Sequence, residues 1–236
     1  QLGEKVYNLT ADGWVIAGAV ASIDREYQGV AYTETYNSLA AAIADAKAGD
    51  TIDLVRDVEM DEILVVDKAL TINGNGNTLT STAARGINVL ADVTIENLTV
   101  VAAGERAINV IQKPANVTID NVTATAANYT VNVAGSAANA VVAIKNSTLN
   151  GLCTVNVAAA GANVTIENLA IDKMYIKHEA SAAAFVGSQH ADAKLTIKNC
   201  YAGKDVLLVS CSTGVFRAYA KNASTFNLSN CYSLAT

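Results

Sequence analysis

Hydrophobic and polar residues alternate along short segments that recur at a nearly constant interval. In the octet 93–100, the apolar Val93 and Ile95 alternate with Thr94 and Glu96, an Asn follows, and the alternation then resumes. Alternation with a period of two is typical of β-strands, because successive side chains point to opposite faces of a sheet. The octet therefore predicts two short strands joined by a one-residue bend.

The octet returns five more times, and every copy contains the Asn. The copies occupy residues 117–124, 142–149, 164–171, 195–202 and 226–233. With a degenerate first copy at Asn73, the Asn residues are Asn97, Asn121, Asn146, Asn168, Asn199 and Asn230. Intervals of 24, 24, 25, 22, 31 and 31 residues separate these seven positions. A strand-type repeat of this length indicates a solenoid.

Asn suits the predicted bend, because it tolerates the left-handed backbone region that β-branched residues avoid. Stacked on successive turns of the solenoid, or rungs, the Asn side chains are expected to form an interior ladder of amides. An amide committed to such a ladder would not carry a glycan. Asn-X-Ser/Thr triplets such as the one beginning at Asn97 are therefore interpreted as by-products of the repeat.

A second repeating strand lies between the octets, at residues 87–89, 108–110, 131–133 and 155–157. Each rung therefore contains three strands, which cannot bury an apolar face until rungs stack on one another. Parallel pairing of equivalent strands would fill the interior with Val, Ile, Leu and Ala. The predicted fold is all-β: a right-handed, single-stranded parallel β-helix with three strands per rung.

The first part of the chain predicts a cap for this solenoid. Residues 38–49 form a short amphipathic helical pattern, with Asn37 or Ser38 as N-cap and Gly49 at its end. Strands at 51–55, 63–66 and 70–73 would follow, and extra strands before residue 36 have no readable arrangement. We expect one domain over residues 1–236, with N-terminal strands and the capping helix in 1–50 and rungs in 51–236.

The last two intervals are longer than the others, which predicts insertions within residues 172–192 and 203–221. Tyr201 and Tyr232 occupy equivalent outward positions beside these insertions, where stacked rings could bind sugar or could protect a strand edge. The other candidate ligand-binding residues in this region are His178, His190, Arg217 and Tyr219.

The outward faces of the octets carry charges and threonines. The position before each Asn is occupied by Glu96, Asp120, Lys145, Glu167, Lys198 and Ser229. Opposite charges on adjacent rungs are expected to pair weakly. Thr99, Thr123 and Thr148 form an outward column, which the β propensity of Thr explains. A flat double-Thr array could bind ice, but charged neighbours and the two tyrosines interrupt it.

Composition excludes several classes of partner. The chain has 51% apolar and 16% charged residues and a net charge of −6, with Lys and Arg scattered singly, which argues against nucleic acid. The apolar run 14–23 is about half a membrane span. The four Cys form no metal motif, and no cofactor motif is present. Cys200 and Cys231 are expected on adjacent rungs, either reduced or as a disulfide.

One segment supports a family resemblance. Residues 36–80, with Ser38-Leu39, Gly49-Asp50-Thr51-Ile52 and Leu70-Thr71-Ile72-Asn73-Gly74, resemble the opening of pectin-lyase-like β-helix modules of bacterial surface proteins. The later octets are similar to the same family. The resemblance implies the β-helix fold, but for activity it implies either polysaccharide lyases and glycosidases or adhesin-like proteins without known chemistry.

The residues favour the non-catalytic branch. Enzymes of this family resemble one another in an acidic Ca²⁺ cluster with a basic residue, or in paired Asp with a Gly-His-Gly segment, and neither set occurs here. Our hypothesis is an adhesin-like module of a secreted or cell-surface bacterial protein that binds a glycan or protein partner, which leaves room for further domains of a longer chain. The competing hypothesis is a polysaccharide lyase or glycosidase that uses Lys204, Asp205, Arg217 and the two histidines. A simple spacer is the third.

Overall fold

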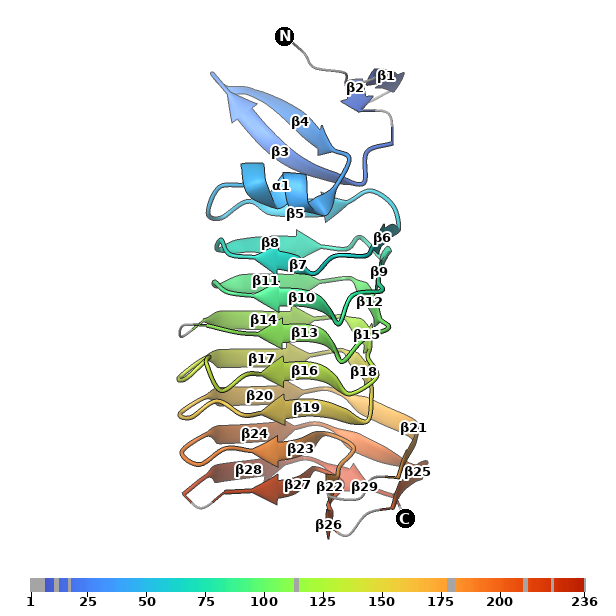
Figure 1. The fold of residues 1–236 in the computed structure, drawn as a ribbon, viewed down its shortest axis with the longest axis vertical. Helices are drawn as coiled ribbons and strands as arrows, with labels where there is room; N and C mark the ends of the chain where they lie inside the picture. The colour runs from blue at the N-terminus through green and yellow to red at the C-terminus, as the bar shows by residue number, and fades with distance from the viewer. Residues whose placement is uncertain are drawn as a thin grey trace.

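Three parallel sheets run along the stack, and each of the first five rungs contributes one strand to each of them (Figure 1). The computed structural model describes residues 7–10, 13–16, 18–112, 115–177, 181–209, 212–221 and 223–235. Within them the strands follow one another around each rung and pair in parallel with the rungs before and after. The predicted parallel β-helix is confirmed.

The first sheet holds the first strand of every octet. Its rung strands are β5 (Thr51–Leu54), β8 (Leu70–Asn73), β11 (Val93–Glu96), β14 (Asn116–Asp120), β17 (Val141–Lys145), β20 (Asn163–Glu167), β24 (Lys194–Lys198) and β28 (Thr225–Ser229). The antiparallel strands β3 (Ala21–Tyr27) and β4 (Val30–Tyr36) extend this sheet at its N-terminal edge.

The second and third sheets complete each rung. The second contains β6 (Val58–Met60), β9 (Thr78–Ser81), β12 (Thr99–Ala102), β15 (Thr123–Thr125) and β18 (Thr148–Asn150). The third contains β7 (Leu64–Val66), β10 (Arg85–Val89), β13 (Arg106–Val110), β16 (Tyr129–Val133), β19 (Cys153–Val157), β23 (Val186–Gln189) and β27 (Arg217–Ala220).

The core is a column of identical positions stacked in register. Ile95 pairs with Ile72 on one side and with Ile119 on the other, and all three side chains are fully buried. Full burial of an Ile side chain contributes roughly 1.5–3 kcal/mol, and here it is reached only because both neighbouring rungs are present. Stability therefore depends on contacts between rungs.

The N-terminal end of the stack is covered by the predicted helix. Helix α1 (Leu39–Asp45) begins after Ser38, whose side chain accepts a hydrogen bond from the Ala41 N–H, so that Ser38 is the N-cap. The helix ends earlier than the Gly49 expected from sequence, because the backbone of Ala46 leaves the helical conformation with a ψ of 145°. The Lys68 ammonium binds the carbonyls of Ile43, Ala44 and Ala46 at this end. Gly49, with a φ of 91°, lies in the turn that follows.

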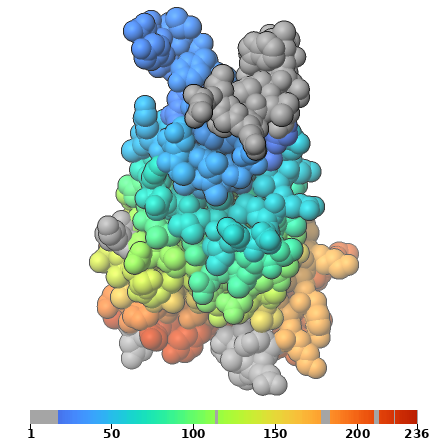
Figure 2. Space-filling model, turned by 45° about the horizontal axis from the view of Figure 1, so that its top comes forward, coloured from blue at the N-terminus to red at the C-terminus, as the bar shows by residue number. Residues whose placement is uncertain are grey.

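A buried arginine holds the hairpin β3–β4 against this cap. The Arg25 side chain is 9% exposed and donates to Asp50, to Asp45 at 3.1 Å and to Glu34 at 3.4 Å. Tyr36 donates to the same Asp45 carboxylate at 2.6 Å. Figure 2 shows the hairpin standing above the body of the molecule at this end. A further antiparallel pair, β1 (Tyr7–Thr10) and β2 (Gly13–Ile16), precedes it.

The first parts of the two predicted insertions extend into a ribbon of strands, and their later parts include β23 and β27 of the third sheet. Strands β21 (Ala170–Lys177) and β25 (Tyr201–Val209) pair in parallel and project beyond the second sheet, and β29 (Tyr232–Ser233) adds a third strand (Figure 1). The short strands β22 (Ser181–Ala182) and β26 (Ser212–Thr213) pair beside them. In the described part of the chain no helix has the length and apolar character to cross a bilayer.

Candidate functional site

The octet Asn residues form an outer corner where the first sheet turns into the second. All six have left-handed backbones, with φ between 50° and 57°, which confirms the predicted bend. The expectation of an interior ladder is wrong, because five of the six are exposed and Asn97 is half-buried. At a left-handed corner the neighbouring residue, such as Leu98, enters the core, and the Asn side chain stays outside.

Hydrogen bonds join most of these amides along the corner. Asn121 donates to Asn97 at 2.8 Å. In a second run of hydrogen bonds, Asn168 donates to Asn146, Asn199 to Asn168 and Asn230 to Asn199, each at 3.1–3.2 Å. Asn73 is not the first member by register, because it pairs with Glu96. The Gly74–Gly76 turn adds residues to the corner between β8 and β9. The Asn97 amide still donates to the Asn73 side chain at 3.1 Å.

A buried amide ladder does exist, but in the third sheet. Asn109 donates to Asn88 at 2.8 Å, Asn132 donates to Asn109 at 2.7 Å, and Asn156 donates to Asn132 at 2.7 Å. Asn109 is fully buried. The repeated strand between the octets contained this signal as an Asn flanked by Ile or Val in every copy.

The outer face of the second sheet has no charged residue from β9 to β18. Its outward positions stack in two registered columns, and six of the eight residues are Thr: Thr78, Thr99, Thr123 and Thr148 in one column, and Thr80, Val101, Thr125 and Asn150 in the other. Sequence reasoning found the first column and missed the second. We call these eight residues, together with the corner Asn97, Asn121 and Asn146, the Asn–Thr face.

A shallow groove crosses the upper part of the Asn–Thr face. It has a volume of about 430 Å³ and is lined by Asn75, Gly76, Asn97, Leu98, Thr99, Asn121 and Thr123. Amides and hydroxyls both donate and accept hydrogen bonds, so this lining can satisfy ligand hydroxyl groups without a charge. Rigid strands hold the side chains in place, which reduces the entropy lost on binding.

The outer face of the first sheet differs, because its charges pair with each other. Lys145 lies 3.0 Å from Asp120, and Lys198 lies 2.8 Å from Glu167. These pairs confirm the predicted charge ladder. Burial opposes ionisation of Asp120, but hydrogen bonds from Asn146 and Lys145 outweigh this effect and lower its pKa.

Tyr201 and Tyr232 stack on adjacent strands, as their repeat positions predicted. Their ring centroids are 5.3 Å apart and their planes differ by 10°. The Tyr201 hydroxyl donates to Asp172, and this hydrogen bond raises the pKa of Tyr201. Tyr232 remains 58% exposed. The pair belongs to the ribbon sheet and does not line the groove of the Asn–Thr face.

The residues of the enzyme hypothesis lie on separate elements. Arg217 and Tyr219 are on β27, where Arg217 donates to Gln189 at 2.7 Å and lies over the Phe226 ring at 4.4 Å. His190 follows β23, and its Nδ1 lies 2.8 Å from the Ala191 carbonyl oxygen.

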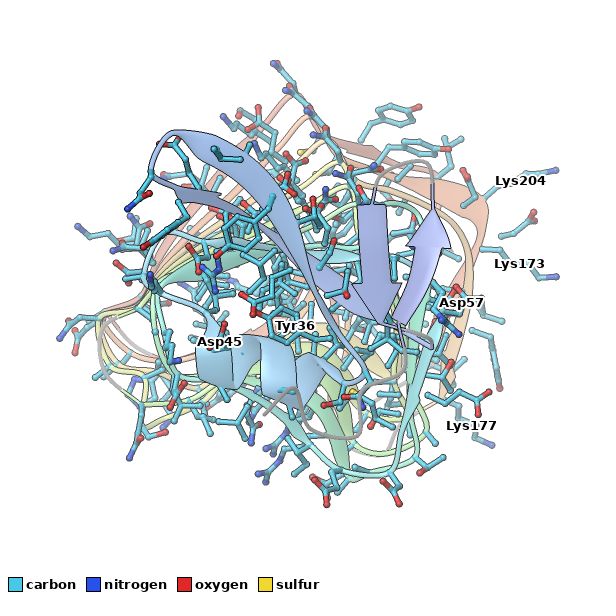
Figure 3. All side chains as sticks on the ribbon, turned by 90° about the horizontal axis from the view of Figure 1, so that it is seen from above. Tyr36, Asp45, Asp57, Lys173, Lys177 and Lys204 are labelled. Atoms are coloured by element: carbon cyan, nitrogen blue, oxygen red, sulfur yellow. The ribbon has the colours of Figure 1, made fainter. Side chains whose placement is uncertain are left out.

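Two further members of the set are on the ribbon. Lys204 and Asp205 belong to β25, and Asp205 pairs in register with Lys173. Figure 3 shows Lys173, Lys177 and Lys204 pointing outward along the ribbon. His178 lies outside the described residues. Within the described ranges no hydrogen bond or ion pair joins Lys204 or Asp205 to Arg217 or His190.

The cysteines are reduced wherever the structure describes them. Cys153, Cys200 and Cys231 are free thiols, and Cys211 lies outside the described residues. The Cys200 backbone N–H donates to the Cys231 sulfur at 3.4 Å, which confirms that the two residues occupy equivalent positions on adjacent rungs.

Acidic and metal-ligating side chains do not gather into a site in the described part of the chain. No group of three or more His, Cys, Asp or Glu residues there has the arrangement to hold a metal ion. The Asn–Thr face repeats in register over four strands and carries no charged residue. Comparisons of the chain with family models, with curated proteins and with solved structures give no match.

Proposed function

We propose that this chain is a non-catalytic, adhesin-like binding module of a secreted or cell-surface bacterial protein, and that its Asn–Thr face binds a neutral glycan. The observation that carries the proposal is the uncharged double column of hydroxyl and amide groups from Thr78 to Asn150, in register over four strands. The resemblance of residues 36–80 to pectin-lyase-like surface modules supports the cellular setting.

The chemistry of the face suits a sugar better than a charged ligand. Each neutral hydrogen bond to a sugar hydroxyl is worth only about 0.5–1.5 kcal/mol net, so that several rungs must act together. The same hydroxyl group recurs once per rung, about 4.8 Å apart, because Thr99 pairs with Thr123 and Thr123 pairs with Thr148. An extended oligosaccharide could therefore make equivalent contacts on successive rungs.

The test is a glycan-binding assay with a matched pair of variants. Thr99→Val with Thr123→Val removes two hydroxyls from the face, whereas Thr94→Val with Thr118→Val makes the same change on the first sheet of the same rungs. We expect the first variant to lose at least about tenfold in affinity for neutral oligosaccharides, while the second binds as the wild type does. Thermal unfolding of both variants checks the fold.

Two results would contradict the proposal. A wild-type chain that binds no neutral glycan, or face and control variants with equal affinity, would remove the Asn–Thr face from consideration. Incubation with neutral and acidic polysaccharides, with and without Ca²⁺, tests the non-catalytic assignment. Release of reducing or unsaturated ends would favour the lyase or glycosidase hypothesis instead.

A further inference from the structure

Two arginines stack on adjacent rungs at the start of the third sheet. Arg85 is the first residue of β10 and Arg106 the first residue of β13, and the two pair in register. Tyr129 begins β16 and occupies the same position one rung further on. Neighbouring parallel strands are about 4.8 Å apart, so the two guanidinium groups start from adjacent backbone positions.

Both arginines lie at the edge of the core and reach solvent. Arg85 is partly exposed and directly precedes the buried Gly86, where an added Cβ would meet the Ala107 carbonyl oxygen at 2.8 Å and the core residue Val100 at 3.5 Å. The Arg106 side chain is 23% exposed, and Tyr129 is partly exposed.

Among the described residues, neither guanidinium has an acidic partner closer than 4.0 Å. The Nε atoms of Arg85 and Arg106 are buried and have no hydrogen-bond partner among the described residues. Arg106 makes one ionic contact, a 4.0 Å approach to the adjacent Glu105, whose own side chain is 59% exposed.

The other three arginines of the chain show the contrast. Arg25 binds three carboxylates, Arg56 donates to the Ala19 carbonyl at 2.7 Å, and Arg217 donates to Gln189. The chain carries 22 acidic and 16 basic residues, so carboxylates are not scarce. Two like charges on adjacent rungs repel each other, and an anion placed between them would relieve that repulsion.

Tyr129 adds an aromatic surface to the pair. The Arg106 Cζ lies 5.9 Å from the centroid of the Tyr129 ring, within the range of a cation–π contact. Guanidinium groups bind carboxylate and sulfate oxygens with paired N–H donors, and aromatic rings pack against the apolar faces of sugars. The three side chains thus combine the two kinds of contact that an acidic sugar offers.

We propose that Arg85, Arg106 and Tyr129 form a binding site for the oxyanion of an acidic glycan, either a uronate carboxylate or a sulfate ester. The oxyanion binds the two guanidinium groups, and the sugar ring packs against Tyr129. The site belongs to the third sheet and stands independently of the neutral-glycan proposal for the Asn–Thr face.

The test is titration calorimetry with the full chain and a panel of probes: oligogalacturonate, a sulfated oligosaccharide and a neutral oligosaccharide of equal length. The variants are Arg85→Gln, Arg106→Gln, Arg106→Lys and Tyr129→Leu. Lys194→Gln is the matched control, because it removes one positive charge from an exposed position on β24. Thermal unfolding of each variant excludes loss of the fold as a cause.

We expect the wild type to bind one or both acidic probes at least tenfold more tightly than the neutral probe. Arg85→Gln and Arg106→Gln lose at least tenfold, and Lys194→Gln loses nothing. Arg106→Lys loses an intermediate amount, because it keeps the charge without the paired donors. Glu105→Gln strengthens binding by removing the competing carboxylate that lies 4.0 Å from Arg106. The preferred probe identifies the oxyanion as carboxylate or sulfate, and the Gln variants tie that preference to the site.

Three outcomes would overturn the proposal: acidic probes that bind no better than the neutral one, folded Gln variants that bind as the wild type does, and an equal loss in Lys194→Gln. Neutral-glycan binding that survives in Arg85→Gln separates this site from the Asn–Thr face. A failure here therefore leaves the function proposed for that face intact.

Discussion

The side-chain amide of Asn146 donates a 2.8 Å hydrogen bond to the carboxylate of Asp120, not to the preceding corner residue Asn121. The same carboxylate lies 3.0 Å from the Lys145 ammonium. This one acid therefore interrupts the outer amide chain and joins it to the charge ladder of the first sheet. The corner is a set of short hydrogen-bonded runs, not one continuous ladder.

The first prediction concerns Asp120→Asn, which keeps an acceptor for Asn146 and removes the charge beside Lys145. Because the folded-state pKa of Asp120 is lowered, its ionised form stabilises the fold above the unfolded value of about 4, and this contribution is lost as pH falls through the folded pKa. We expect Asp120→Asn to lower the free energy of unfolding by up to about 1 kcal/mol at pH 7 and to have no effect in acid. Urea unfolding at a series of pH values measures this difference, with Asp192→Asn as the exposed control. A pH-independent difference would contradict this account.

The buried ladder gives the second prediction. Asn109→Ala leaves the Asn88 acceptor and the Asn132 donor without their partner in a buried position. Each unsatisfied buried group costs about 1–3 kcal/mol, so we expect a loss of about 2–4 kcal/mol in the free energy of unfolding. Asn227→Ala, at an exposed position on β28, should change it by less than about 0.5 kcal/mol. Equal effects of the two substitutions would refute the role assigned to the ladder.

The third prediction concerns the left-handed corner. Asn121 has a φ of 53°, a conformation that Gly adopts without strain and that β-branched residues avoid. Asn121→Val should destabilise the chain by about 1–3 kcal/mol more than Asn121→Gly does. Both variants remove the same amide. The difference between their free energies of unfolding, measured by chemical denaturation, therefore reports the cost of placing a β-branched residue in the left-handed conformation. A Val variant as stable as the Gly variant would show that the corner tolerates another backbone conformation.

The fourth prediction concerns the N-terminal cap. Arg25→Met leaves Asp45 and Asp50 without their shared cation while retaining much of the apolar stem. Removal of one partner from a buried ion pair costs about 3–5 kcal/mol, and the low end applies here because Asp45 is 55% exposed. We expect a lower melting temperature and faster hydrogen exchange in α1. Lys145→Met, which breaks an exposed pair, should have a much smaller effect, and similar losses in both variants would argue against a special role for the cap.

The fifth prediction distinguishes the thiols. Burial raises the pKa of Cys153 and of Cys200 to about 11, so both are almost entirely protonated and unreactive at pH 8. Cys231, which is less buried, should be alkylated faster than either. Mass spectrometry of a Cys211→Ser variant after timed iodoacetamide treatment gives the order of modification. Modification of Cys153 before Cys231 would contradict the burial of Cys153 in the structure.

Periodicity predicted the fold because it reports which side chains share a face. Thr94 and Ile95 were placed on opposite faces correctly, and the Asn97 bend was recognised as the break in alternation. Periodicity does not report the angle between successive strands, so it could not show that Asn97 lies on an outer corner. The neighbouring Leu98, which enters the core, was compatible with either direction of the Asn side chain.

The Asn–Thr face was harder to predict than the core for a related reason. Thr80 and Thr125 lie after the octet positions that define the repeat, so the second threonine column was visible only once the second-sheet strands were aligned. Arg85 and Arg106 are 21 residues apart in the sequence and look isolated there. Each lies two residues before an Ile of the third-sheet strand, Ile87 or Ile108. Alignment of these two Ile residues places the two arginines at equivalent positions on adjacent rungs.

The in-register stacking of rungs has a consequence for how such a chain can change. A duplication of one complete turn, about 24 residues, inserts another copy of every outward column and leaves the geometry of the existing copies unaltered. A partial duplication would instead shift every later column to a different side of the molecule. Descendants of this chain can thus change the length of each outward column only in whole units.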